Sequence, residues 1–360
     1  MMAENESSYN TTPITSFANA EIPIPRIVRF WFLIIFEVPS TGCALFVLFY
    51  ILTDHKQRWS VKNHALIALL LTGLGCQLID IPFYLSFIVH SYVIGGTSFL
   101  CNTWWFADIG LYNGGAIVMA WLAFERHILV FHDRLHSTRK KRILIHYLPL
   151  SFLVVYICAF YIYAIYFFPC ENTYDYTLPL CNGSPCYEND PIIGMWDMII
   201  NSATSSFLEG FFSLTFLIRI IWRKYRAHVP IQRRKQRKLI IQLMCLSVLN
   251  MTFNFPLTII QIIHLCGVPS DVGLTASQYL FFFCYLVIFT VPFICLGSIG
   301  NIKKTFQENI FRRRQRVRPF QVGVELTLFQ MNAATRNKSI APRLIASGIE
   351  IGPIRRDTKT

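Results

Sequence analysis

The chain has 360 residues, of which 54% are hydrophobic and only 15% are charged, and its mean hydropathy is +0.44. Soluble domains carry about 25% charged residues, so this composition argues against a soluble globular protein and indicates lipid as the surrounding medium. The formal net charge of +13 would suggest a nucleic-acid partner in a soluble protein, but the basic residues cluster in a few loops, and we expect no nucleic acid.

Seven apolar segments are long enough to cross a membrane, because a hydrocarbon core of about 30 Å needs about 20 residues of helix. The fifth segment is the weakest, since it contains six polar residues between positions 201 and 209. The predicted fold is an all-α membrane protein, with a seven-helix transmembrane bundle over 27–300 after an extracellular tail over 1–26. The spans are predicted at 27–52, 64–89, 100–128, 143–168, 193–221, 239–265 and 275–298.

A short amphipathic eighth helix is predicted after the last span, at 301–316. Ile302, Phe306 and Ile310 recur every four residues beside five Lys and Arg residues. This pattern is typical of a helix that lies on the inner leaflet of a membrane. A solvated run of charge is the alternative interpretation. Residues 317–360 follow as a cytoplasmic tail.

The distribution of basic residues among the loops predicts the orientation of the bundle. Lys and Arg are concentrated after the first, third and fifth spans, whereas the stretch 168–193 contains four acids and no base. The N-terminus is therefore expected outside and the C-terminus in the cytoplasm, with the plasma membrane as the location. Three glycosylation acceptor sequences fall on the predicted outer side, at Asn5, Asn10 and Asn182.

Several cysteines lie on the predicted outer side, where oxidising conditions permit disulfides. Cys101 is at the outer start of the third span, and Cys170, Cys181 and Cys186 lie in the second outer loop. We predict one bridge from Cys101 to that loop, with Cys186 favoured over Cys181, and allow a second bridge within the loop. Connectivity itself cannot be read from a sequence.

The third span ends in an acid, a base and a histidine: Glu125, Arg126 and His127. Burying charge in lipid is expensive, which makes these residues functional candidates. Together with seven spans and an outside N-terminus, the triplet resembles the Asp-Arg-Tyr triplet of the rhodopsin-like G-protein-coupled receptors. Cys101 lies 25 residues before Arg126, which is that family's separation between its disulfide cysteine and its arginine.

The sixth and seventh spans resemble the same family but depart from its motifs. Pro256 and Pro292 match its helix-kinking prolines, each of which removes a backbone donor. Asn254 stands in place of the family's toggle tryptophan, and Cys295 in place of the tyrosine after the second proline. Gly73 stands where the family usually has its sodium-binding aspartate. The chain therefore resembles a divergent member of the family.

The resemblance implies a cell-surface receptor that binds an extracellular ligand and activates a heterotrimeric G protein. Arg126 would rest against Glu125 in the inactive state and meet the G protein when the sixth span moves outward. His127 completes this coupling switch. An arginine that only fixes the membrane topology is the alternative interpretation. The class of ligand stays open among amines, peptides and environmental chemicals.

Asp108 is the leading candidate for ligand contact. It lies 18 residues before Arg126, or about five helical turns, where amine receptors of the family place their ammonium-binding aspartate. Tyr285 matches a tyrosine that helps those receptors to enclose the amine. Alternatively, Asp108 holds the bundle together through hydrogen bonds to neighbours such as Tyr285 or Asn113. The other pocket candidates are polar residues of the fifth and sixth spans, Ser202, Ser205 and Asn254.

Two other classes of protein compete with a receptor: an enzyme, and a transporter or channel. The sequence has no nucleophile elbow and no phosphate loop, and its histidines, among them His64 and His146, are too dispersed for a metal pair. We therefore expect no catalytic residues, no metal and no cofactor. A transporter or channel for a small polar solute is the alternative function, because its path would also contain buried acids.

Overall fold

The computed structural model describes residues 22, 24–131, 138–227, 234–269 and 271–298. The chain divides into two units, residues 1–300 and 301–360, and all described residues belong to the first. These residues contain no strand, and seven helices are long and apolar enough to cross a membrane. The prediction of an all-α, multi-pass membrane protein with seven spans is confirmed. The predicted eighth helix lies outside the described residues.

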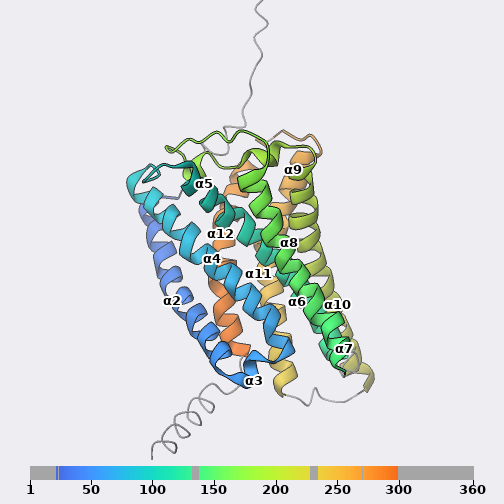
Figure 1. Ribbon diagram of the computed structural model, residues 1–360. Coiled ribbons are helices and arrows are strands. Elements are labelled where there is room, and N and C mark those ends of the chain that lie inside the picture. The colour runs from blue at the N-terminus through green and yellow to red at the C-terminus, as the bar shows by residue number, and fades with distance from the viewer. Residues whose placement is uncertain (1–21, 23, 132–137, 228–233, 270, 299–360) are drawn as a thin grey trace, which may run out of the picture. The chain divides into compact units, whose positions relative to one another are not determined.

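Consecutive spans run in opposite directions through the bundle (Figure 1). Some spans are one helix, and others join a short helix, a π-helical stretch and a long helix end to end. The helices in chain order are α2 Arg26–Thr53, α3 His55–Arg58, α4 Val61–His90, α5 Ser98–Trp105, α6 Tyr112–Phe131, α7 Arg139–Arg142, α8 Leu148–Ile162, α9 Ile193–Trp196, α10 Ser205–Ala227, α11 Arg234–Leu265 and α12 Leu274–Ser298. The π-helical stretches are Phe106–Leu111, Ile143–Tyr147, Tyr163–Phe167 and Asp197–Thr204.

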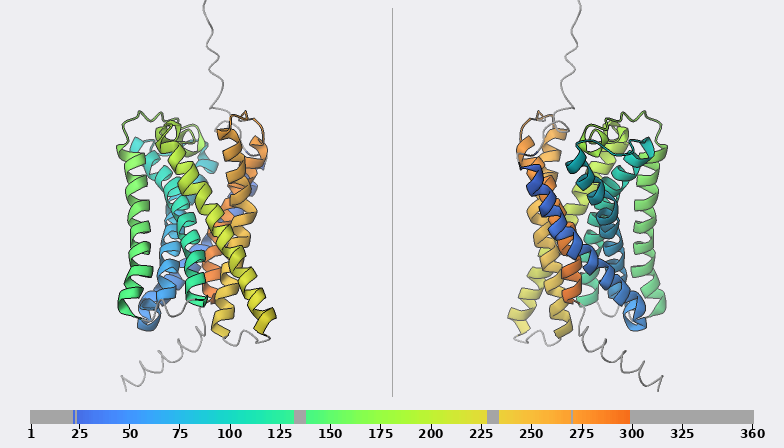
Figure 2. Two further views of the ribbon diagram at one scale, coloured as in Figure 1. Left: turned by 90° about the vertical axis from the view of Figure 1, so that its right-hand side faces the viewer. Right: turned by 90° about the vertical axis from the view of Figure 1, so that its left-hand side faces the viewer.

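The helices pack as a ring in the order α2, α4, α6, α10, α11 and α12, and α12 closes the ring against α2. The right-hand view of Figure 2 shows α2 and α12 side by side, although they lie at opposite ends of the sequence. The span of α8 packs on the outside of the third span. Accordingly, 56% of the most apolar stretch of the third span is buried, against 17% for the fourth. The third span, with both Asp108 and Arg126, is therefore the central helix.

The observed spans begin and end within four residues of the predicted bounds. They include the weak fifth span, where the polar side chains face inward. Asn201, Ser206 and Glu209 are buried, whereas Phe207 and Phe211 are exposed on the other side. A helix with a polar inner face and an apolar outer face suits a lipid-surrounded bundle, because polar groups must find partners inside it.

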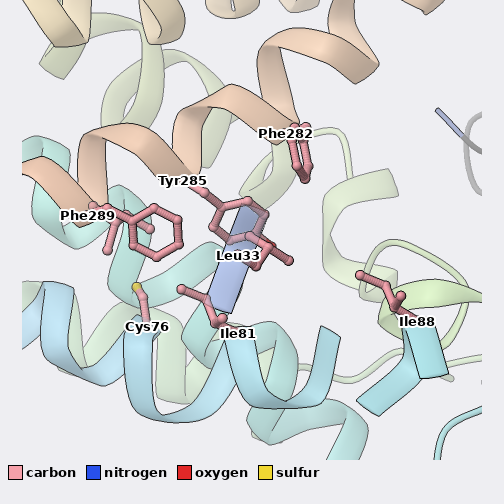
Figure 3. Close-up of a cluster of buried hydrophobic side chains, with 8 residues drawn as sticks. Leu33, Cys76, Ile81, Ile88, Phe282, Tyr285 and Phe289 are labelled. Atoms are coloured by element: carbon pink, nitrogen blue, oxygen red, sulfur yellow. The ribbon is translucent and has the colours of Figure 1, made fainter. Parts of the chain in front are cut away.

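A hydrophobic cluster joins α2, α4 and α12 (Figure 3). A buried polar chain runs beside it: Gln77 Nε2 donates to Ser40 Oγ at 2.6 Å, and Ser40 donates to the Phe289 carbonyl at 2.8 Å. Three residues further along α12, Pro292 lacks the N–H that would bond the Ile288 carbonyl. Like Pro256 in α11, Pro292 lies inside a long helix, as the sequence predicts. The cluster consists of Leu33, Cys76, Ile81, Ile88, Phe282, Tyr285, Ile288 and Phe289.

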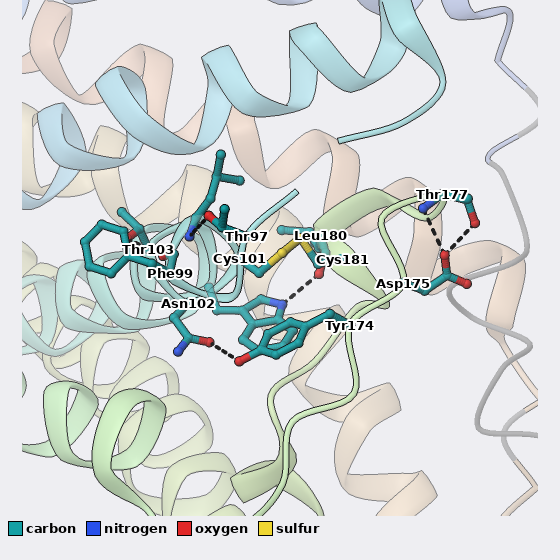
Figure 4. The surroundings of a disulfide bond; sticks show 12 residues. Thr97, Phe99, Cys101, Asn102, Thr103, Tyr174, Asp175, Thr177, Leu180 and Cys181 are labelled. Atoms are coloured by element: carbon teal, nitrogen blue, oxygen red, sulfur yellow. Dashed lines mark hydrogen bonds between the residues drawn. A yellow bond between two sulfur atoms is a disulfide. The ribbon is translucent and has the colours of Figure 1, made fainter. Parts of the chain in front are cut away.

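Two disulfides join the loop between α8 and α9, and one of them corrects the sequence prediction. Cys101 is bonded to Cys181, not to the favoured Cys186, and Cys186 is bonded to Cys170 within the loop. Local hydrogen bonds account for this pairing (Figure 4). Trp105 Nε1 donates to the Leu180 carbonyl at 2.7 Å, which brings the next residue, Cys181, against α5.

Cys186 is held separately, against residues from the start of the same loop. Its backbone N–H donates to Asn172 Oδ1 at 2.8 Å, and Asn172 lies two residues after Cys170. Asn182, a predicted glycosylation acceptor, is partly exposed beside the first bridge. Asn5 and Asn10 lie outside the described residues.

Removing the Cys101–Cys181 bridge should destabilise the protein by about 2 to 4 kcal/mol, because the bridge closes a long loop. Cys101→Ser and Cys181→Ser should have equal effects on the free energy of unfolding in detergent, and the double variant should be no less stable than either. Mass spectrometry of the non-reduced, digested protein would identify the linked peptides. A peptide that joins Cys101 to Cys186 would contradict the structure.

Candidate functional site

The triplet predicted as a coupling switch lies at the predicted inner end of α6 and is buried. Glu125 is 2% exposed, Arg126 is 1% exposed and His127 is 9% exposed. An acid and a base that are adjacent in a helix do not face each other, so each must find contacts on other helices. The structure shows three different environments for the three side chains.

Glu125 faces a histidine of the fourth span. The Nδ1 atom of His146 lies 2.7 Å from Glu125 Oε1, and the His146 side chain is fully buried. The other ring nitrogen of His146, Nε2, lies 3.1 Å from His64 Nδ1 on α4. One ring nitrogen of His146 therefore faces the carboxylate and the other faces His64, so this ring connects the third span to α4.

The sequence pattern does not reveal this histidine pair. His64 and His146 are too dispersed in the sequence to predict a metal site, and the structure brings them together from separate spans. In the described residues, no group of three or more His, Cys, Asp and Glu has an arrangement that could hold a metal ion. The pair is better explained by the carboxylate beside it. Only a packing model of α4, α6 and α8 could have indicated it, because 82 residues separate the two histidines.

Arg126 faces the centre of the bundle between Glu125 and the seventh span. The charge of Glu125 and the thiol of Cys295 on α12 both interact with its guanidinium. Gln242 of α11 donates to the same sulfur at 3.6 Å. The sixth and seventh spans therefore meet at the residue that Arg126 faces.

His127 connects α6 to α10 instead. Its Nε2 atom lies 2.6 Å from the Phe212 carbonyl and 3.3 Å from Thr215 Oγ1. Its ring packs against Phe216, with the ring centroids 5.2 Å apart. These contacts give His127 a structural role on the side of α6 that faces the fifth span.

A chain of polar side chains crosses the middle of the bundle from α10 to α6. Glu209 accepts hydrogen bonds from Ser247 Oγ at 2.6 Å and Asn250 Nδ2 at 2.7 Å. Asn254 donates to Asn250 and accepts from the Tyr112 hydroxyl. The structure thus places Asn254, a predicted pocket residue, inside a hydrogen-bonded network that links α6, α10 and α11.

A cavity of about 40 Å³ lies beside this network. Thr72, Gly73, Tyr112 and Asn254 contribute to its lining together with apolar residues, and no acid is among the described lining residues. The volume is enough for a few water molecules. Gly73 supplies no carboxylate at the position where the resembled family binds sodium, so this cavity is not suited to a cation.

Three aspartates lie toward the predicted outer end of the bundle, and two of them accept hydrogen bonds from side chains of other segments. Asp197 accepts from the Tyr161 hydroxyl at 2.6 Å, from Tyr187 at 2.9 Å and from Asn201 Nδ2 at 2.8 Å. Asp80 accepts from Trp104 Nε1 at 2.8 Å, and the Tyr285 hydroxyl is a second partner. Both acids therefore hold helices together.

Asp108 is different. It is partly exposed in the π-helical stretch Phe106–Leu111, and its carboxylate has no hydrogen-bond donor among the residues that the structure describes. The carboxyl groups of Asp80 and Glu188 lie within electrostatic range, so three acids are close to one another at this end of the bundle. π-Helical turns inside a longer helix are frequent at functional sites.

The alternative interpretation of Asp108 as a helix-bridging residue finds no support in the described contacts. The Tyr285 hydroxyl bonds Asp80, and Asn113 contacts the Tyr161 hydroxyl. Neither predicted neighbour is therefore directed to Asp108. On the fifth span, Ser205 is buried and Ser202 is partly exposed.

No protein-family model matches the chain, and no curated protein sequence matches it.

The Glu125–His146 contact can be measured with a double-mutant cycle. His146→Phe leaves a buried carboxylate without its partner and should be strongly destabilising. Glu125→Gln removes the charge, so His146→Phe should cost less in that background, with a coupling of about 0.5 to 3 kcal/mol in the free energy of unfolding. Unfolding would be followed in detergent.

The matched control for this cycle is His127→Phe, two residues after Glu125 in the sequence but directed to α10. Its effect should add to that of Glu125→Gln within about 0.5 kcal/mol. Additivity of the His146 and Glu125 variants would show that the two side chains do not act as a pair.

Proposed function

We propose that this protein is a rhodopsin-like G-protein-coupled receptor of the plasma membrane, with its N-terminus outside and its C-terminus in the cytoplasm. The main support is the buried Glu125–Arg126 pair at one end of the central helix in a bundle of seven spans. The resemblance of this pair to the family's coupling switch and the bridge from Cys101 to the second outer loop also favour the proposal.

The contacts around Arg126 suggest how the switch operates. Buried ion pairs are weak evidence of stabilisation, because desolvation can exceed the attraction, and their best-attested use is in specificity and switching. An outward shift of α11 would separate Gln242 from Cys295 and open the space under Arg126. His146 would hold Glu125 in both states, so that the arginine can leave the acid without stranding a buried charge.

The ligand is proposed to be a small molecule or peptide with a cationic group. Asp108 supports this, because the carboxylate of this partly exposed residue has no described donor and lies near two other acids, an arrangement that a cationic group would stabilise. The ligand must bind the active state more tightly than the inactive one, since equal affinity for both states shifts no population. Closer contact with Asp108 in the active state would supply this difference.

The switch is tested by nucleotide exchange on Gα in cells that display the protein at their surface. The cells are exposed to a panel of biogenic amines and neuropeptides, and we expect a response that Arg126→Ala abolishes at equal surface expression. Arg139→Ala, an exposed arginine at the same end, is the control and should retain the response. An undiminished response in Arg126→Ala would refute the switch, and ligand-dependent solute flux without nucleotide exchange would favour a transporter.

The ligand contact is tested with Asp108→Asn and any cationic agonist found in that panel. Loss of a charge-assisted hydrogen bond costs about 1.5 to 3 kcal/mol, so potency should fall by about tenfold or more. Asp197→Asn is the matched control, because three protein donors already occupy that acid. Equal potency in Asp108→Asn and the unaltered receptor, at equal surface expression, would remove Asp108 from the binding site.

A further inference from the structure

A hollow at the predicted inner end of α6 and α10 has no part in the proposed switch. Its volume is about 400 Å³, within the roughly 300 to 1,000 Å³ of small-ligand sites. One aromatic residue of α6 and four residues of α10 form its described lining. These are Phe131, Arg219, Trp222, Arg223 and Arg226.

The spacing on α10 explains why these side chains converge. Positions 219, 222, 223 and 226 follow the i, i+3, i+4, i+7 pattern and share one helical face. The Arg219 guanidinium lies 4.5 Å from the centroid of the Phe131 ring, and that of Arg226 lies 5.8 Å from the Trp222 ring. Cation–π contacts of this kind hold the guanidinium groups in place without neutralising them.

The described lining of the hollow contains three arginines and no acid. The sequence has no Asp or Glu between Glu209 and Asp271, and Asp133, two residues after Phe131, lies outside the described residues. Arginines on one helical face repel one another, and an anion between them relieves that repulsion. This face of α10 is therefore suited to a ligand with several negative charges.

The position on the helix indicates where that ligand comes from. Leu214, Ile218 and Ile221 are exposed on the preceding turns of α10, and Trp222 and Tyr225 are exposed at its end. Apolar side chains that give way to Trp and Tyr mark the level where acyl chains meet headgroups. A lipid can thus reach the hollow from the bilayer, with its chains along α10.

We propose that this hollow binds the headgroup of a phosphoinositide of the inner leaflet. Guanidinium groups bind phosphate oxygens in a bidentate manner, and basic pockets at the cytoplasmic ends of spans bind such headgroups. Arg219, Arg223 and Arg226 together match a headgroup with more than one phosphate better than a single phosphodiester. The inference depends on the inward orientation of this end and not on receptor activity, so binding is measured without a G protein.

The experiment uses the full-length protein in nanodiscs of phosphatidylcholine. A fluorescent phosphatidylinositol bisphosphate is titrated, with phosphatidylserine at equal total charge as the competitor. Replacing all three arginines, R219Q/R223Q/R226Q, should weaken binding of the bisphosphate by about tenfold or more. R219K/R223K/R226K keeps the charge but loses the planar donors, so its affinity should be intermediate.

The matched control is R139Q/K140Q/K141Q, which removes three charges from exposed residues of α7 at the same end. It should bind the bisphosphate as tightly as the unaltered protein does. Equal loss in both charge variants, or equal competition by phosphatidylserine, would show diffuse attraction and overturn the site. Unchanged lipid binding in R219Q/R223Q/R226Q would also overturn it. If the same variant lost G-protein activation in the cell assay, the hollow would be a contact for a protein and not for a lipid.

Discussion

The arrangement of this bundle depends on one constraint: a polar group that faces lipid has no partner, so it must find one inside the protein. The fifth span shows the consequence most clearly. Its polar face turns inward, where Glu209 meets Ser247 and Asn250 of α11, and its apolar side chains remain on the outer surface. The same requirement joins α2, α4 and α12 through Gln77 and Ser40.

This constraint also separates structural acids from functional candidates. Asp80, Asp197 and Glu209 are each engaged by side chains of neighbouring helices, which is what a packed bundle needs from a buried carboxylate. Asp108 is partly exposed and has no such donor among the described residues, although it lies on the most buried span. An intramembrane acid of this kind is a candidate contact for a cation that comes from elsewhere.

The sequence was sufficient for the spans, because length and hydropathy are local properties that the bilayer thickness constrains. It was not sufficient for contacts between distant segments. The favoured partner of Cys101 was wrong, since the choice between Cys181 and Cys186 depends on the hydrogen bond from Trp105 to the loop. His146 was likewise invisible as the partner of Glu125, because their proximity follows from the packing of α8 on α6.

The pairing of Glu125 with His146 changes what a switch at Arg126 requires. In a simple acid–arginine pair, release of the arginine strands a buried carboxylate, which makes the active state costly. Here His146 can remain beside the acid when, in the proposed receptor, Arg126 exchanges Glu125 for an external partner. The energy difference between the two states would then depend on the contacts of Arg126 alone. Ligand binding at the other end of the same span would have to supply only that smaller difference.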